Sequence, residues 1–283
     1  MKDSLDYTIN VRGQLFSLKE PQVMGILNCT PDSFYSGSRK QTEAEVADRA
    51  NQIVSEGGSI IDVGAFSTRP GAAEVNEEEE CQRLQRALEI VRREQSQVPI
   101  SVDTYRPMVA RRCIEEWGAD IINDVSEGGI TGIVNTPIHE SGSMFDVVAS
   151  LQVPYILMSV KSNLHDMLIA FAQEVQQLRD LGAKDIILDP GFGFGKTLEE
   201  NYKILNEMER LQILDLPLLV GVSRKSMIFK LIGGNPVTSL NGTTAIHAIS
   251  LMKGGRILRA HDVKEAVETV RIYQALNGIY PQK

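Results

Sequence analysis

The sequence predicts an α/β fold, a (β/α)8 TIM barrel preceded by a short β-hairpin, and three observations support this. Eight short runs rich in Val and Ile alternate with segments of helical periodicity, which is typical of a closed parallel sheet. The 283 residues, 42% hydrophobic and 23% charged, can bury the core that one barrel needs. No linker, low-complexity tract or internal repeat divides the chain, so we expect a single domain over residues 1–283.

The expected elements follow in order along the chain. Residues 7–11 and 14–18 flank Arg12-Gly13, a turn pattern that predicts a hairpin over about residues 7–18 at the bottom of the barrel. The barrel is expected over about residues 22–277, with strands at 23–30, 59–65, 99–104, 121–126, 155–160, 185–191, 217–223 and 256–261. Helices are expected between the strands, for example at 43–57 and 77–93. The acidic run 77–80 suits a helix N-terminus, and we interpret it as solvated rather than as a metal site.

Composition argues against several classes of protein. A net charge of −8 and a pI near 5.2 are unlike those of proteins that track nucleic-acid phosphates. No stretch approaches the roughly 18 apolar residues of a membrane-spanning helix, and the N-terminus lacks the apolar core of a signal peptide. Cys29, Cys81 and Cys113 are odd in number and form no CxxC, which favours reduced thiols. We therefore expect a cytoplasmic protein with neither nucleic acid nor membrane as a partner.

Polar residues follow most of the predicted strands, where barrel enzymes place their catalytic groups. Asp103, Asn123 and Asp189 end the third, fourth and sixth strands. Their acceptor oxygens and amide suit a flat heterocycle that carries several N–H donors and a carbonyl. The spacing does not distinguish one polar ring from another.

A second group of side chains is suited to a diphosphate. Asn28 ends the first strand, Arg69 follows the second, and Arg259 and His261 end the eighth. Because these strands are contiguous in a closed barrel, the four side chains can converge on one anion. The amide oxygen of Asn28 is also a candidate Mg²⁺ ligand. Taken one at a time, polar residues after strands also fit ordinary roles such as helix capping. Outside this group, Lys196 fits a helix cap and Phe192 fits loop packing.

Sequence motifs place the chain beside a known family. The segment 24–34, MGILNCTPDSF, resembles the first signature of dihydropteroate synthases. Further blocks follow in family order: 62–64 (DVG), 67–72 (STRPGA), 101–104 (SVDT), 122–124 (IND), 189–197 (DPGFGFGKT), 221–226 (GVSRKS) and 259–263 (RAHDV). The resemblance covers residues 21–277 approximately.

The resemblance implies a Mg²⁺-assisted substitution at a pterin methylene carbon, in which pyrophosphate leaves and the arylamine of p-aminobenzoate attacks. It implies that Asp103, Asn123, Asp189 and Lys225 hold the pterin, and that Asn28, Arg69, Arg259 and His261 hold the diphosphate and metal. The p-aminobenzoate would be bordered by Phe34, Thr68, Pro70, Phe192 and Ser226. The groups expected to act in the chemistry are Asp103, Lys225, Arg259 and His261. A homodimer and a target for sulfonamides are implied as well.

Three positions depart from the family pattern, and two alternatives stay open. Residues 158–160 read Met-Ser-Val where Met-His-Met is usual, Ser36 stands where a second acidic residue is common, and Ala65-Phe66 replaces Gly-Glu. One alternative is a pterin-dependent methyltransferase, but a methyl carrier expels no diphosphate and gives no reason for the cations Lys225, Arg259 and His261. The other is a catalytically silent pterin-binding paralogue, favoured only by the departures.

Overall fold

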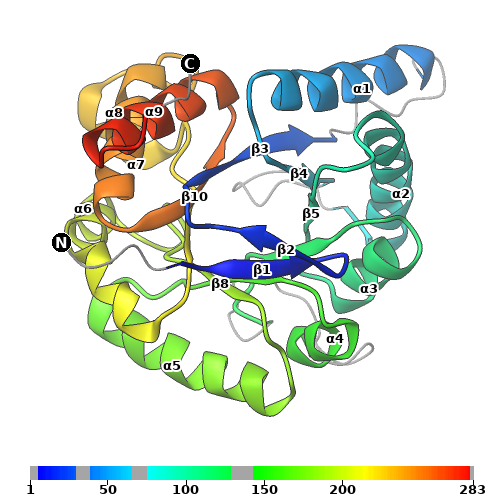
Figure 1. The fold of residues 1–283 in the computed structure, drawn as a ribbon, viewed down its shortest axis with the longest axis horizontal. Coiled ribbons are helices and arrows are strands. Elements are labelled where there is room, and N and C mark those ends of the chain that lie inside the picture. The colour runs from blue at the N-terminus through cyan, green and yellow to red at the C-terminus, as the bar shows by residue number, and fades with distance from the viewer. Residues whose placement is uncertain (1–5, 30–38, 66–74, 129–142, 281–283) are drawn as a thin grey trace.

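The computed structural model describes residues 6–29, 39–65, 75–128 and 143–280. Eight parallel strands close into a barrel in the order β10-β3-β4-β5-β6-β7-β8-β9, which confirms the predicted fold (Figure 1). They are β3 (Gln22–Asn28), β4 (Ile60–Gly64), β5 (Ile100–Asp103), β6 (Ile121–Asp124), β7 (Tyr155–Met158), β8 (Ile186–Asp189), β9 (Leu218–Val220) and β10 (Gly255–Ala260). The strands are nearly continuous runs of apolar residues because the helices cover their outer faces and side chains fill the interior.

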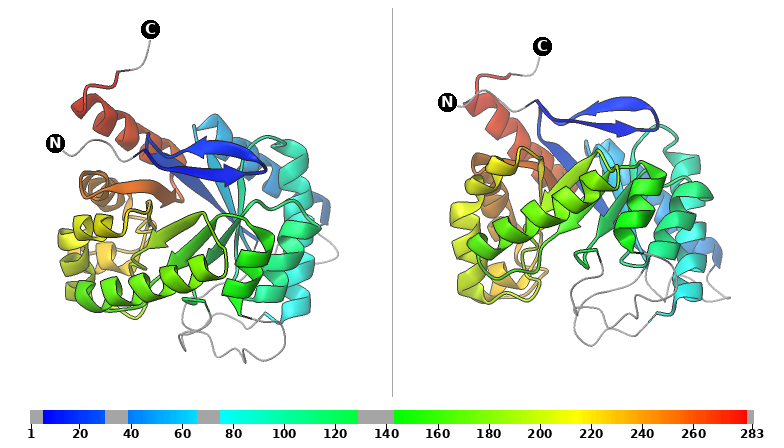
Figure 2. Two further views of the ribbon diagram at one scale, coloured as in Figure 1. Left: turned by 60° about the horizontal axis from the view of Figure 1, so that its bottom comes forward. Right: turned by 90° about the horizontal axis from the view of Figure 1, so that it is seen from below.

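Helices surround the barrel, as Figures 1 and 2 show. They are α1 (Arg39–Ser55), α2 (Glu77–Glu94), α3 (Pro107–Glu115), α4 (Met144–Leu151), α5 (Leu164–Asp180), α6 (Leu198–Glu207), the 3-10 helix η2 (Met208–Leu214), α7 (Ser226–Ile232), α8 (Leu240–Met252) and α9 (Val263–Leu276). Among the described residues, no helix is both long and apolar enough to cross a membrane. The interpretation of run 77–80 as solvated is wrong for Glu80. Its side chain is fully buried, because the ion pair with Arg106 replaces its contacts with water.

The predicted hairpin is also confirmed. β1 (Thr8–Val11) and β2 (Gln14–Ser17) are antiparallel and lie across one end of the barrel (Figure 1). Arg12 and Gly13 form the turn with φ values of 52° and 78°, the left-handed pair that matches the twist of a two-residue hairpin. Ile9 and Val11 pack into the barrel interior and close its amino-terminal end.

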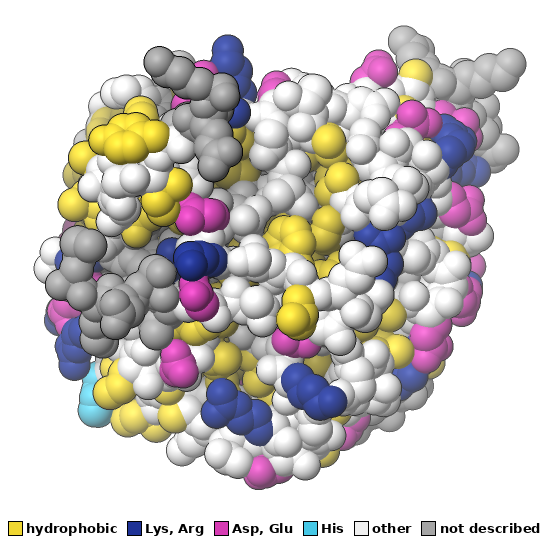
Figure 3. All heavy atoms as spheres, viewed as in Figure 1, with side chains coloured by type: hydrophobic (Ala, Val, Ile, Leu, Met, Phe, Trp, Pro, Cys, Tyr) yellow, Lys and Arg dark blue, Asp and Glu magenta, His cyan; other side chains and the backbone are white. Residues whose placement is uncertain are grey.

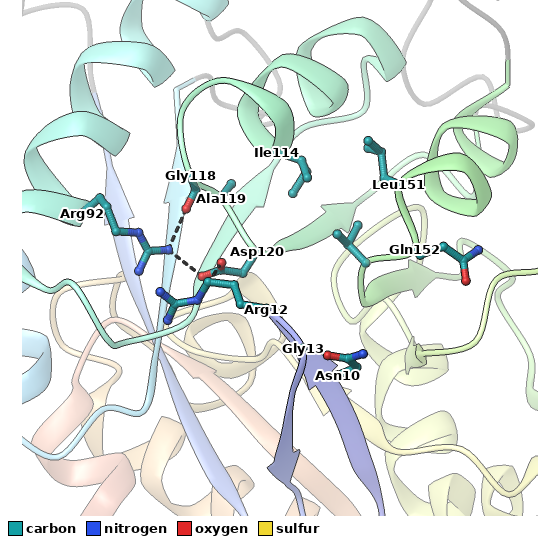
Figure 4. Close-up of a pocket in the computed structure, with 11 residues that line it drawn as sticks. Asn10, Arg12, Gly13, Arg92, Ile114, Gly118, Ala119, Asp120, Leu151 and Gln152 are labelled. Atoms are coloured by element: carbon teal, nitrogen blue, oxygen red, sulfur yellow. Dashed lines mark hydrogen bonds and ion pairs between the residues drawn. The ribbon is translucent and has the colours of Figure 1, made fainter.

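A cavity of about 480 Å³ lies beside this hairpin, at the end of the barrel away from the carboxyl ends of the strands (Figure 4). Arg12 and Arg92 both point to Asp120, which also accepts a hydrogen bond of 2.8 Å from the backbone N–H of Ile100. Both guanidinium groups also donate to the backbone carbonyl of Ser96, in the turn after α2. These contacts hold the hairpin to the barrel, so we interpret the cavity as structural.

Candidate active site

The carboxyl ends of the strands bring the predicted polar residues to one rim. Asp103 ends β5, Asn123 lies one residue before the end of β6, and Asp189 ends β8. Arg259 lies one residue before the end of β10. Asp103 pairs in register with Asn123, which places both at the same level of the barrel. Parallel strands thus deliver these side chains to the end where barrel enzymes bind their substrates.

Arg259 forms the centre of a partly buried cluster. Its Nε lies 2.6 Å from Oδ2 of Asp62, and its Nη2 lies 2.7 Å from Oδ2 of Asp103. The amide nitrogen of Asn123 donates to the same Asp62 carboxylate at 3.2 Å. Asp62, to which the sequence analysis assigned no role, is fully buried and joins β4, β6 and β10. Its signals in the sequence were a carboxylate inside an otherwise apolar strand and its place in the family block 62–64.

The electrostatics of the cluster follow from burial and pairing. Burial is the main cause that raises the pKa of Asp103 to about 7; the carboxylates of Asp62 and Glu80 add to this rise, and the charges of Arg259 and Lys225 oppose it. Burial acts to lower the pKa of Arg259, but Asp62 and Asp103 outweigh it and the pKa is raised. Arg259 is therefore a permanent cation, whereas Asp103 changes charge near neutral pH.

Lys225 lies at the next part of the rim, as the N-cap residue of α7. Its Nζ donates to the carbonyl of Phe192 at 2.6 Å and lies 4.5 Å from the centroid of the Phe194 ring. Burial lowers the pKa of Lys225 to about 8, an effect that the carboxylate of Asp189 opposes. Ser226, the first residue of α7, follows directly and is partly buried. The ammonium group thus has only a carbonyl and an aromatic face as its closest partners among the described residues, and both can be exchanged for a ligand.

Gly221 marks the point where three polar groups converge. A Cβ built on it would lie 3.7 Å from Nζ of Lys225, 3.9 Å from Oδ2 of Asp189 and 4.0 Å from Cδ of Arg259. The other oxygen of Asp189 accepts from the backbone N–H of Gly191 at 2.8 Å. Burial raises the pKa of Asp189 despite the nearby Lys225. The carboxylate of Asp189, the ammonium of Lys225 and the aliphatic stem of Arg259 therefore border one small space.

Asn28 lies on the other side of Asp103, at the exposed end of β3. A Cβ built on Gly64 would lie 3.6 Å from Oδ1 of Asn28 and 3.7 Å from Oδ2 of Asp103. Oδ1 of Asp103 is buried and has no hydrogen-bond partner among the described residues. Within these residues no group of three His, Cys, Asp or Glu side chains could hold a metal. The oxygen donors present fit Mg²⁺, which takes few protein ligands when substrate phosphates supply others.

His261 follows β10 and is fixed from two sides. Both its Nδ1 and its backbone N–H lie 3.1 Å from Oγ of Ser223, which follows β9. Its carbonyl accepts from Nη2 of Arg49 on α1 at 2.7 Å. The imidazole therefore stands at the same rim as Arg259, as expected from the sequence.

The remaining predicted residues divide into two groups. Phe192 is described, but its side chain is fully buried in the core and only its carbonyl faces Lys225, so its contact with p-aminobenzoate stays a prediction. The others lie outside the described residues, and their roles stay predictions too; they are Phe34, Thr68, Arg69 and Pro70. The departures at Ser36 and Phe66 also lie outside them.

The altered end of β7 has its own buried partner. Met158 is fully buried, and Oγ of Ser159 donates to Oε1 of the buried Glu127 at 2.8 Å. Lys196 does not cap a helix, because Thr197 is the N-cap of α6. Instead its Nζ donates to three carbonyls, including that of Ser159 at 3.0 Å. The loops after β7 and β8 are thereby tied together beside Asp189.

Comparisons with known proteins agree with this geometry. The pterin binding enzyme family matches residues 24–261. A dihydropteroate synthase from Escherichia coli K12 is 39% identical over 279 residues, covering 93% of this chain and 94% of the relative. The structure of a Xanthomonas albilineans dihydropteroate synthase with 4-aminobenzoic acid has a TM-score of 0.85 at 32% identity, covering 97% of this chain and 99% of that one. The same enzyme in complex with 7,8-dihydropteroate has a TM-score of 0.79 at 28% identity and covers 96% and 99%. The chain belongs to the dihydropteroate synthase family of pterin binding enzymes.

Proposed function

We propose that this site condenses 6-hydroxymethyl-7,8-dihydropterin diphosphate with p-aminobenzoate, giving 7,8-dihydropteroate and pyrophosphate. The chain is then a transferase that forms a C–N bond at the pterin methylene in folate biosynthesis. The observation that carries the proposal is the convergence of Asp189, Lys225 and Arg259 around Gly221, next to Asp103. This arrangement offers acceptors for a heterocycle and cations for a leaving diphosphate in one place.

The pterin ring would be held by groups that still have unused capacity. Asn123 donates its amide nitrogen to Asp62, which leaves its amide oxygen for a ring N–H. Oδ2 of Asp189 points toward the space beside Gly221, and Lys225 can donate to the ring carbonyl or a ring nitrogen. A cationic methylene left behind by pyrophosphate would be stabilised by the carboxylate of Asp103.

The diphosphate would be met by Arg259, His261, Asn28 and Arg69. The contacts of Arg259 with Asp62 and Asp103 use two of its N–H groups, so others remain for phosphate oxygens. Asn28, with the unpartnered oxygen of Asp103 beside it, would hold Mg²⁺. When bound, Mg²⁺ would neutralise the charge that grows on the departing pyrophosphate.

The test is incubation of the protein with the pterin diphosphate, p-aminobenzoate and Mg²⁺. Mass spectrometry would follow dihydropteroate, and a coupled assay would follow pyrophosphate. Pyrophosphate without dihydropteroate would indicate a hydrolase. Tight binding of a pterin without either product would indicate a catalytically silent paralogue.

Asp189→Ala is expected to weaken pterin binding about ten- to a hundredfold, because hydrogen bonds to a charged carboxylate are lost. Calorimetric titration with a pterin measures the effect. Asp180→Ala, the same substitution at the exposed end of α5, is the control and should leave the affinity unchanged. Equal affinity of wild type and Asp189→Ala would remove Asp189 from the pterin site.

We also propose that the protein is a homodimer and that it is cytoplasmic. Figure 3 shows hydrophobic side chains at the upper left, over the region where α8 and α9 lie in Figure 1. These two helices carry four exposed apolar residues, which we call the C-terminal patch: Ile249, Met252, Ile272 and Leu276. Exposed apolar patches of this kind often mark interfaces. The three buried free cysteines suit a reducing compartment.

Leu276→Glu is expected to convert the dimer to monomer, because the side chain is 74% exposed in the monomer and a charge there would be buried in the interface. Analytical ultracentrifugation of wild type and variant measures the change. Leu15→Glu on the hairpin, where the leucine is 78% exposed, is the matched control outside the patch. A wild-type protein that sediments as a monomer would end the dimer proposal.

A further inference from the structure

Glu80 differs from the other acidic residues at the start of α2. Glu77 and Glu78 are exposed, but the side chain of Glu80 is fully buried between α2 and the end of β5. A buried carboxylate is unfavourable unless charged and hydrogen-bonded partners replace its water. The partners of Glu80 therefore define what it does.

Its two carboxylate oxygens hold two different residues. Oε1 accepts from Oγ1 of Thr104 at 2.6 Å, and Oε2 forms an ion pair with Nη1 of Arg106. The other nitrogen of that guanidinium, Nη2, donates to the carbonyl of Val75 at 2.7 Å. Thr104 directly follows Asp103, and Val75 lies just before the N-cap of α2. Glu80 thus links the residue after Asp103 to the start of its own helix.

The neighbouring glutamate takes part in a parallel arrangement. Arg83, also on α2, forms an ion pair with Glu79 and donates to the carbonyl of Ala65 at 3.1 Å. Ala65 follows Gly64, which borders both Asp103 and Asn28. Arg83, which is paired with Glu79, therefore holds the backbone at Ala65 after β4. In the same way Arg106, which is paired with Glu80, holds the backbone at Val75 before α2.

We propose that Glu80 is a positioning residue for the condensation, acting through Thr104 and Arg106 to fix the Asp103 carboxylate against Arg259. This inference rests on the proposed function, because it takes the chemical role of Asp103 from there. Glu80 itself touches neither substrate. Its buried side chain fixes the backbone next to Asp103, and displacements of about 1 Å in an active site can lower rates by about a hundredfold.

The test compares Glu80→Gln with wild type. The amide keeps the shape and an oxygen for Thr104 but loses the ion pair. We expect kcat to fall about ten- to a hundredfold. Pterin affinity should stay within about twofold, since the contacts of Asp189 and Lys225 do not involve Glu80.

A matched control separates positioning from general stability. Asp120→Asn disrupts another buried acid that pairs with arginines, at the opposite end of the barrel. We expect it to destabilise the fold while kcat stays as in wild type. Equal kinetic losses in Glu80→Gln and Asp120→Asn, or wild-type kinetics in Glu80→Gln, would overturn the proposal.

A second pair of variants decides the question if Glu80→Gln does not fold. Thr104→Val removes the hydroxyl that Glu80 accepts from, with little change in shape, and should lower kcat. Thr104→Ser keeps the hydroxyl and should restore it. Identical kcat in the two variants would refute the role of Glu80. A wild-type protein that forms no dihydropteroate would instead refute the proposed function.

Discussion

Asp103→Asn is expected to lower kcat about a hundred- to a thousandfold, while pterin affinity changes little. The amide keeps the size of the side chain but removes the charge that would stabilise a cationic pterin methylene. It also removes one of the two carboxylates that hold Arg259. Steady-state kinetics and calorimetric titration with a pterin measure the two effects separately. Wild-type turnover in this variant would show that Asp103 does not stabilise the cation.

The same variant should change the pH dependence of kcat/KM, which reports groups of the free enzyme. Because the pKa of Asp103 is raised to about 7, the carboxyl is protonated and neutral below that pH, so activity falls as the pH decreases through neutrality. Asparagine does not titrate, so this acid limb should disappear in the variant. Asp185→Asn, directly before strand β8 and at the end of the barrel away from the rim, is the control and should keep the limb.

Removal of divalent metal with excess chelator is expected to lower turnover at least about a hundredfold, and added Mg²⁺ should restore it. Without the ion, the charge of the departing pyrophosphate loses its main counter-charge. Asn28→Ala should raise the Mg²⁺ concentration needed for half-maximal activity, since one oxygen ligand is lost. Asn163→Ala, at the N-cap of α5, is the control. Full turnover in excess chelator would eliminate the metal from the mechanism.

The barrel was predictable because its strands are buried on both faces and therefore appear as short apolar runs. The same logic located Asp103, Asn123 and Asp189, since each follows such a run. The predicted strands were longer than the observed ones; for example, residues 217–223 contain the short strand β9. Polar residues after a strand do not show where its hydrogen bonding ends.

The partners of these residues were not predictable from local sequence. Asp62 and Arg259 are 197 positions apart and meet only because the barrel closes. Glu80 stands in an acidic run whose other exposed members match the expectation for a helix start, and only the position of Arg106 shows why it is buried. The link between Ser159 and Glu127 joins one departure from the family pattern to a buried carboxylate that follows β6. Such pairings depend on three-dimensional proximity, which periodicity does not encode.

The hairpin that plugs the barrel has a consequence for how the chain is made. Ile9, Val11 and Leu18 leave the ribosome well before Ile257, yet they share one buried cluster with it. Strand β3 likewise has no neighbour on one side until β10 has been made. A nascent chain therefore carries an apolar hairpin without its final partners while the whole barrel is synthesised, a state in which chains are prone to aggregate. Closure of the barrel and burial of its amino-terminal plug become one event, which can occur only after β10 has been made.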